Sequence, residues 1–237
     1  MNRFADIKTV FVDLDDTIWD FTANSKVTMA EVFAQLGLES QCDYATYIKS
    51  YVRHNKDLWE QYHHGEIEKD FLIRERFVRT FNECGITSDI EDFPMYVNEI
   101  YLARLATKDK AVEGAVELLT HLNKLGSVHI LSNGFKNVQS KKLKSAHLDG
   151  LIDKIVLSDD ICVTKPDRRL FDYALEVVGG KPETTVMIGD NYEADILGAR
   201  NAGWKTIFFD RRNTQLEEDL SDLRVNFLKD IIPYFHL

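Results

Sequence analysis

The stretch TVFVDLDDTIWD, residues 9–20, comes almost at the start of the chain and decides how the rest is interpreted. A run of β-branched and aromatic residues at 10–12 is typical of a buried strand. Three carboxylic acids, Asp13, Asp15 and Asp16, follow it at once. Burying a carboxylate is costly unless a cation or a hydrogen-bond donor compensates its charge. The stretch therefore indicates a metal, a cationic substrate or a catalytic task.

The composition limits the classes of partner. A chain of 237 residues, 44% of them hydrophobic and only four of them proline, can form one large domain or a main domain with a smaller companion. The formal net charge of -10 disfavours a nucleic acid polymer or an anionic membrane surface. A small anionic substrate is still compatible with it, since a metal and a few cations can reverse the field inside a pocket.

The cysteines and the apolar runs bear on the compartment. Cys42, Cys84 and Cys162 are far apart and form no CxxC pair, which argues against a zinc site or a disulfide framework. The sequence has no apolar run of signal-peptide length near its start. It also has no continuous run of the roughly 20 apolar residues that a membrane helix needs. We expect a reduced, cytoplasmic protein.

Two kinds of sequence pattern divide the chain. Residues 21–107 contain no convincing strand, and their apolar residues recur at a spacing that predicts about four helices. From about residue 113, short apolar β-rich runs alternate with helical patterns, which is typical of βαβ units and a parallel sheet. We therefore predict an α/β fold in which residues 1–20 and 108–237 form one core domain, interrupted by a helical domain at 21–107.

Polar side chains follow the predicted strands of the core. In a parallel sheet the carboxyl ends of the strands frame the binding crevice. In chain order, the polar residues at these ends are Asp13, Asp15 and Thr17, then Ser132 and Asn133, then Lys165, then Asp190 with Asp195 shortly after. Each group alone fits a solvated loop, a turn or a helix cap. Their joint order at successive strand ends favours a single site.

The acids suit a metal ion. Asp13 and Asp15 can point the same way, because side chains two residues apart share one face of an extended segment. Two like charges that close disfavour joint ionisation unless a cation lies between them. Asp190 would complete an oxygen-rich site suited to Mg²⁺, which prefers a few carboxylates plus substrate phosphate and water. Ser132 as a hydrogen-bond donor and Lys165 as a point charge would then bind an anion.

The motifs DLDDT, SNG, KP and GD, in that order, resemble the four motifs of the haloacid dehalogenase-like (HAD) hydrolase superfamily. The resemblance covers about residues 6–20 and 108–210. It implies a Rossmann-like parallel sheet with an inserted all-helical cap of the first type. Within the superfamily, the stretches VDLDDTIWDF, SNGFKNVQSKKL and KPDRRLFDYAL resemble the pyrimidine 5′-nucleotidase branch.

The resemblance implies a Mg²⁺-dependent phosphatase, a phosphoric monoester hydrolase that acts through an aspartyl-phosphate. Asp13 would attack phosphorus, and Asp15 would protonate the leaving oxygen and later deprotonate the hydrolytic water. Mg²⁺ would be held by the Asp13 carboxylate, the Asp15 backbone carbonyl and Asp190. The residues implied to bind the phosphoryl group are Ser132, the backbone N–H of Asn133 and Lys165, and those implied to support the site are Thr17 and Asp195.

Two positions bear on the chemistry within the superfamily. Asp15 argues against dehalogenase chemistry, because the dehalogenase branch lacks an acid two residues after its nucleophile. Asp16 stands where the phosphatases often have glycine. Since that position mainly contributes backbone, and the nucleotidase branch also has aspartate there, we expect activity to survive.

The resemblance favours pyrimidine nucleoside 5′-monophosphates, of the UMP, dUMP or dTMP type, as substrates, with Trp19 and Phe21 stacking on the base. The alternatives are a phosphatase for another small metabolite (a sugar phosphate, sialic acid 9-phosphate or phosphoglycolate) and a non-catalytic ligand-binding protein of the same fold. The expected partner is thus a small phosphate ester, with no nucleic acid polymer and no membrane. We expect a monomer or a homodimer.

Overall fold

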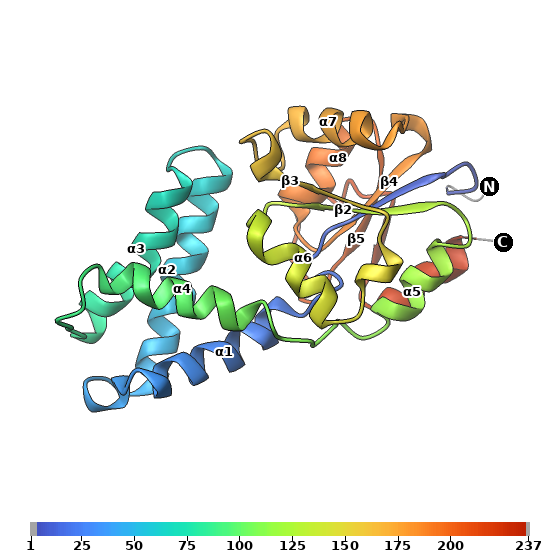
Figure 1. The fold of residues 1–237 in the computed structure, drawn as a ribbon. Helices are drawn as coiled ribbons and strands as arrows, with labels where there is room; N and C mark the ends of the chain where they lie inside the picture. Colours follow the sequence, from blue (N-terminus) through green and yellow to red (C-terminus); the bar gives the residue numbers. More distant parts are fainter. Residues whose placement is uncertain (1–3, 236–237) are drawn as a thin grey trace. The chain divides into compact units, whose positions relative to one another are not determined.

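The computed structural model describes residues 4–235, and the chain divides into two compact units (Figure 1). The core unit contains the residues up to Phe21 and from Asp109 onward, and the helical unit contains Thr22–Lys108. The strands and α-helices of the core unit are β1 (Thr9–Val12), α5 (Ala115–Leu122), β2 (Ser127–Ser132), α6 (Lys136–Ser145), β3 (Lys154–Leu157), α7 (Arg168–Val178), β4 (Thr185–Gly189), α8 (Gly198–Asn201), β5 (Lys205–Phe209) and β6 (Leu223–Val225). A π-helical turn, Tyr192–Leu197, precedes α8, and the 3₁₀ turns of this unit are Asp149–Leu151, Ser158–Asp160, Pro182–Thr184 and Leu228–Tyr234.

Within residues 4–235 the sheet has six strands, all parallel, in the order β3-β2-β1-β4-β5-β6. The predicted α/β class with a Rossmann-like parallel sheet is confirmed. Strand β1 lies between β2 and β4, with Val12 beside Ile130 on one side and Ile188 on the other. The carboxyl ends of these three strands are therefore level, and β1 carries its carboxylates to the middle of the sheet edge.

Helices cover both faces of the sheet, α5 and α6 on one and α7 and α8 on the other (Figure 1). This arrangement follows from the strand order, because right-handed crossovers that run in opposite directions place their helices on opposite faces. Strands β1 and β4 are buried along their whole length, as their near-continuous apolar sequences require.

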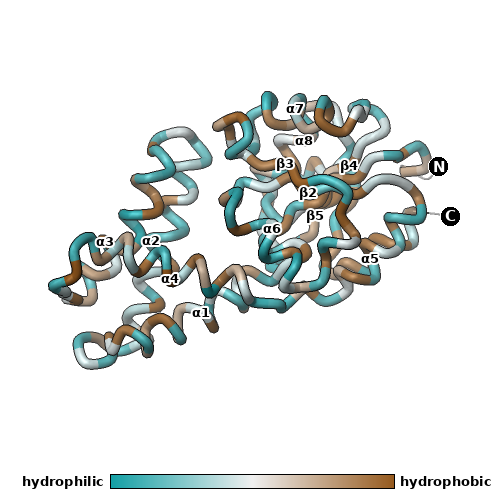
Figure 2. Tube along the Cα trace, viewed as in Figure 1, coloured by the Kyte–Doolittle hydropathy of each residue, from teal (hydrophilic) through white to brown (hydrophobic). Residues whose placement is uncertain are grey.

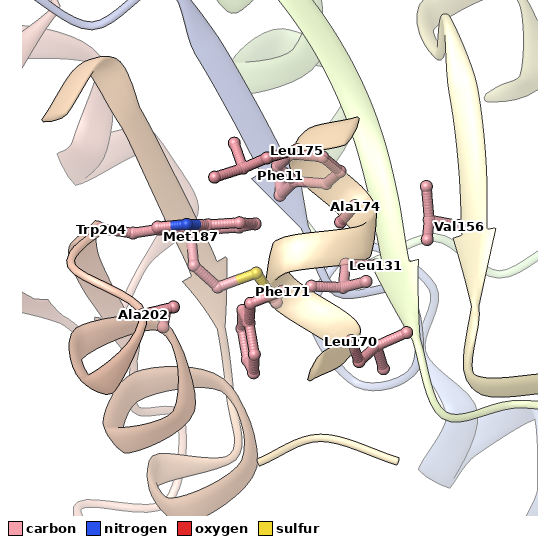
Figure 3. Packing of buried hydrophobic residues seen from close by; sticks show 11 residues of the cluster. Phe11, Leu131, Val156, Leu170, Phe171, Ala174, Leu175, Met187, Ala202 and Trp204 are labelled. Carbon is pink, nitrogen blue, oxygen red and sulfur yellow. The ribbon is translucent and has the colours of Figure 1, made fainter. Parts of the chain in front are cut away.

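A buried cluster fixes the central strands against α7 and α8 (Figure 3). Phe11 of β1 stacks on Trp204, with ring centroids 4.9 Å apart, and Phe171 of α7 meets the same indole edge-on at 5.2 Å. Leu131 and Met187 add the neighbouring strands to the cluster. Because side chains alternate along a strand, this packing fixes the face of the sheet to which each side chain of β1 points.

The helical unit contains α1 (Phe21–Gln35, whose first residue belongs to the core unit), the 3₁₀ turn Leu38–Ser40, α2 (Tyr44–His63), α3 (Lys69–Cys84) and α4 (Phe93–Leu105). Its interior is aromatic: Tyr51 lies 5.3 Å from Phe77 and 5.9 Å from Tyr101 between ring centroids. Figure 2 shows hydrophobic and hydrophilic stretches alternating along these helices. No helix among the described residues is long and apolar enough to cross a membrane.

Candidate active site

Three strand ends bring polar side chains to one edge of the sheet. Asp13 follows β1, and its backbone N–H donates to the Ile188 carbonyl of β4 at 2.9 Å. Ser132 ends β2 and Asp190 follows β4. The hydroxyl oxygen of Ser132 accepts from the N–H of Gly134 at 3.0 Å and from a side-chain amide of α6. The O–H hydrogen of Ser132 is therefore the group that it can donate to an anion.

Lys165 reaches this edge from the loop after β3 and is almost fully buried. Its ammonium donates to Asp13 Oδ1 at 2.7 Å, to Asp195 Oδ1 at 2.6 Å and to the Leu131 carbonyl at 2.8 Å. Burial opposes the charge, but the two carboxylates outweigh it and hold the pKa of Lys165 above its usual value. The side chain of Asn133 fixes the backbone of Lys165, accepting from its N–H at 2.8 Å and donating to its carbonyl at 3.0 Å.

The site carries uncompensated negative charge. Burial raises the pKa of Asp13 to about 7 in spite of Lys165, and the charges of Asp195 and Asp15 add to the rise. Burial also raises the pKa of Asp190 well above its usual value, together with the charges of Asp13 and Asp195. Carboxyls in such surroundings favour protonation unless a cation is present. A divalent cation would supply the missing charge.

The carboxylates lie close enough to share a metal ion. Asp13, Asp190 and Asp195 each offer an oxygen within 4.8 Å of the others. Asp195 already accepts from Lys165 through Oδ1 and from the backbone N–H of Asn191 at 3.0 Å through Oδ2. Asp13 and Asp190 are therefore better placed than Asp195 to hold a cation. This buried cluster of hard oxygen donors fits a metal site of the magnesium type.

Thr17 fastens the loop after β1 to the end of β4. Its hydroxyl lies 3.3 Å from Asp190 Oδ1 and 3.5 Å from Asp13 Oδ2, and it accepts from the N–H of Asp190 at 3.1 Å. The Thr17 side chain is fully buried. Thr17 thus fixes the two carboxylates relative to each other, and its predicted supporting role stays a prediction.

The carboxylate of Asp15 turns toward α6. Lys142 donates to its two oxygens at 2.7 and 2.9 Å, and Gln139 donates to Oδ2 at 2.9 Å. The Gln139 amide also donates to the Ser132 hydroxyl oxygen at 2.7 Å. Neither Gln139 nor Lys142 is among the site residues expected from the sequence. The available signal is that both fall on the same helix stripe as the apolar Val138 and Leu143, where a surface helix buries its residues.

With this geometry in place, comparisons with known proteins give the family. A sequence model described as haloacid dehalogenase-like hydrolase matches residues 7–203. The chain belongs to the haloacid dehalogenase-like hydrolases. The superfamily expected from the four motifs is thereby confirmed, and with it the assignment as a hydrolase.

Relatives of this HAD hydrolase act on different phosphate esters. The pyrimidine 5′-nucleotidase YjjG of Escherichia coli (strain K12) is 30% identical over 213 residues, which cover 90% of each chain. The glyceraldehyde 3-phosphate phosphatase of Pyrococcus furiosus is 31% identical over 207 residues, which cover 86% of this chain and 80% of its own. A crystal structure of the HAD-hydrolase YfnB from Bacillus subtilis, bound to magnesium, matches with a TM-score of 0.85 at 24% identity over 95% of this chain and 96% of its own. At 24% identity, the match with this crystal structure shows a shared fold.

The aspartate that departs from the common HAD phosphatase pattern has a physical explanation in this HAD hydrolase. Asp16 adopts a left-handed backbone conformation with φ of 62°, which glycine adopts most easily and aspartate tolerates better than most residues. Its carboxylate accepts from Arg212 at 2.9 Å, with Arg211 3.9 Å away. The loop after β5 therefore pairs the charge that aspartate adds at this position.

The two aromatic residues expected to stack on a base lie beside Lys142. Trp19 is fully buried, and the Lys142 ammonium lies 4.7 Å from the centre of its ring. Phe21 is partly exposed, with the same ammonium 5.5 Å from its ring. The structure gives Trp19 a packing role, so substrate stacking stays a prediction, for which Phe21 is the more accessible residue.

Proposed function

We propose that this HAD hydrolase is a Mg²⁺-dependent phosphatase that hydrolyses pyrimidine nucleoside 5′-monophosphates, of the UMP, dUMP or dTMP type, through an aspartyl-phosphate. The single observation that carries the chemistry is the buried contact of Lys165 with both Asp13 and Asp195, beside Asp190. It combines a carboxylate, a fixed cation and a candidate metal site. The pyrimidine preference is supported by the nucleotidase relative from Escherichia coli.

In the first step, a carboxylate oxygen of Asp13 bonds to phosphorus while the bond from phosphorus to the ester oxygen breaks. Asp15 gives its proton to that departing oxygen, which leaves as the nucleoside hydroxyl. In the second step, water attacks phosphorus and Asp15 takes the proton of the water. Orthophosphate leaves and Asp13 is restored. Splitting the displacement in two lets one carboxylate pair act in both halves.

The phosphoryl group would be bound by Ser132, the backbone N–H of Asn133 and Lys165. All three ammonium hydrogens of Lys165 already have acceptors, so Lys165 would act on the phosphoryl group through its charge more than through a direct hydrogen bond. The side chain of Asn133 is hydrogen-bonded to the backbone of Lys165. The group of Asn133 assigned to the phosphate is therefore its own backbone N–H. These donors would stabilise charge on the equatorial oxygens.

Mg²⁺ would be held by the carboxylates of Asp13 and Asp190 and by the backbone carbonyl of Asp15. When bound, it supplies positive charge that neutralises the transferring phosphoryl group. Asp195 and Thr17 would support the site by fixing Lys165 and Asp190. We further propose that residues 1–20 with 108–237 are the catalytic core domain and that 21–107 are a cap domain that selects the leaving group.

A second candidate is a phosphatase for another small metabolite, such as a sugar phosphate, sialic acid 9-phosphate or phosphoglycolate. It is favoured by the relative that acts on glyceraldehyde 3-phosphate at a similar identity. The residues assigned above all act on the phosphoryl group, so they serve either substrate class. A non-catalytic binding protein on this fold is less favoured, because the acids and the lysine that chemistry requires are all retained.

The experiment that tests the proposal is phosphate release from a panel of nucleoside monophosphates and sugar phosphates, with Mg²⁺ or with EDTA. The Asp13→Asn variant is measured beside the wild type. Metal-dependent release that favours pyrimidine nucleotides and is lost in Asp13→Asn is the expected result. Preferential release from a sugar phosphate would contradict the proposed substrate class and leave the proposed mechanism intact. No release from any ester would contradict the proposed activity.

A further inference from the structure

Helix α6 turns two polar side chains into the interior of the core unit. Gln139 is fully buried and Lys142 is 4% exposed, although glutamine and lysine are residues that usually reach water. Burying an ammonium group is costly unless it is paired and hydrogen-bonded. The hydrogen-bond partners of these two side chains therefore explain why both are buried.

Both partners belong to the proposed catalytic machinery. The Lys142 ammonium donates to both oxygens of Asp15, which fixes the plane of the carboxylate as well as its position. The Gln139 amide nitrogen donates to Asp15 at 2.9 Å and to the Ser132 hydroxyl oxygen at 2.7 Å. The amide is oriented with its nitrogen toward both partners, so that it donates to the carboxylate oxygen and to the hydroxyl oxygen.

The surroundings keep these contacts in place. A Cβ atom at Gly134 would lie 2.0 Å from the Gln139 amide nitrogen, so the glycine of the SNG motif makes room for this side chain. The Lys142 ammonium lies over the rings of Trp19 and Phe21, at 4.7 and 5.5 Å from their centres. Aromatic faces attract a cation and shield it from water. Both side chains are thus held from more than one side.

We propose that Lys142 and Gln139 are positioning residues for the general acid–base Asp15, an inference that rests on the proposed function. Lys142 fixes the carboxylate, and Gln139 sets its distance from Ser132, the residue assigned to the phosphoryl group. A general acid must lie within hydrogen-bond reach of the departing oxygen. The Gln139 amide links Asp15 to Ser132. It would therefore hold Asp15 within hydrogen-bond distance of the departing oxygen for any leaving group.

The inference predicts a dependence on the leaving group. Proton donation matters most for a poor leaving group, such as the 5′-hydroxyl of a nucleoside, and little for p-nitrophenolate, which leaves readily as an anion. In Lys142→Met, which keeps most of the apolar length of the side chain and removes its charge, we expect kcat/KM on the preferred nucleotide to fall about 100-fold, in the range of general acid–base effects. On p-nitrophenyl phosphate we expect a fall of less than about 3-fold in the step that forms the aspartyl-phosphate, measured as kcat/KM.

Matched variants separate positioning from a structural role. Lys141→Met removes an exposed lysine from the same helix and should leave both activities unchanged. Lys142→Arg restores a cation that can reach a carboxylate and should recover part of the nucleotide activity. In an Asp15→Asn background, Lys142→Met should cause little further loss, because residues that act as one unit are not additive. Gln139→Met, expected to show the same leaving-group pattern, serves if Lys142→Met fails to fold.

The outcomes distinguish this inference from the proposed function. Wild-type turnover with equal losses on nucleotide and p-nitrophenyl phosphate in Lys142→Met would overturn the positioning role and leave the phosphatase intact. Additive losses with Asp15→Asn would overturn it as well. A wild type that releases phosphate from no ester would contradict the proposed function, and the positioning role would fall with it.

Discussion

Replacing the proposed nucleophile should stabilise the protein while abolishing its activity. Burial and the neighbouring acids raise the pKa of Asp13 from an ordinary 3.8 to about 7. A carboxyl shifted that far costs up to about 4 kcal/mol of folding free energy once it is ionised. In Asp13→Asn the charge is absent, while Lys165 retains its contacts with Asp195 and with the Leu131 carbonyl. We therefore expect the variant to be more stable by about 2–4 kcal/mol at pH 8 without metal.

The sign of the pH dependence follows from proton binding. Between pH 3.8 and about 7, folded wild type holds a proton on Asp13 that the unfolded chain has released, so wild-type stability falls as the pH rises through this window. The advantage of Asp13→Asn should therefore be largest above pH 7 and should shrink toward pH 4. The wild-type penalty reflects a buried acid, so the effect should be absent from the exposed Asp57→Asn of α2.

The assay is urea unfolding of the wild type and both variants in EDTA, at several values between pH 5 and pH 8. Adding Mg²⁺ should narrow the gap at pH 8, because a cation bound to ionised Asp13 stabilises the wild type. An Asp13→Asn protein that is less stable than wild type at pH 8 would refute the reasoning. A difference of constant size at every pH would refute it too.

Three further changes test other parts of the structure. Asp190→Asn should weaken Mg²⁺ binding, because it removes a carboxylate assigned to the metal. In a thermal-shift titration, the Mg²⁺ concentration that gives half of the increase in melting temperature should be at least about 10-fold higher than for the wild type. Phe11→Ala should lower the free energy of unfolding by about 3–5 kcal/mol in urea, since it opens a cavity beside Trp204. Gly134→Ala should lower kcat on a nucleotide by about 10-fold or more in steady-state kinetics, because its Cβ would displace Gln139 from Asp15.

The sheet could be predicted from the sequence because its strands are short apolar runs between helical patterns. The exception is β6, Leu223–Val225, which has only three residues with a charged arginine in the centre. It is too short to be recognised by an alternating or a continuous apolar pattern. The helical segment after β4 is divided, into the turn Tyr192–Leu197 and α8. Periodicity alone does not separate a π-helical turn from an α-helix.

The candidate site was predictable as far as its residues come directly after strands. Asp13, Ser132 and Asp190 meet because parallel strands in register end at one level, a rule that needs no coordinates. Lys142 and Gln139 lie on a helix, and what they contact depends on how α6 is rotated against the sheet. Arg212 lies in a loop without a repeating pattern. Such contacts follow from packing rather than from local sequence.

The charge at the sheet edge argues that metal and phosphate bind together. Lys165 contacts Asp13 and Asp195, which lie beside Asp190, and Lys142 contacts Asp15 at the same edge of the sheet. When all four acids are ionised, they outnumber the two lysines by two, which is the charge of one divalent cation. A phosphate dianion should therefore be repelled until the cation is bound.

We accordingly expect orthophosphate to bind at least about 10-fold more tightly with Mg²⁺ than with EDTA at pH 8, in isothermal titration calorimetry. By linkage, phosphate must tighten Mg²⁺ binding by the same factor, so either titration measures the coupling. Asp190→Asn is the informative control: it removes a carboxylate assigned to the metal, so its affinity for phosphate should gain less from Mg²⁺ than that of the wild type. Equal orthophosphate affinity with and without Mg²⁺ in the wild type would mean that the lysines alone balance these acids, and the charge argument would be wrong.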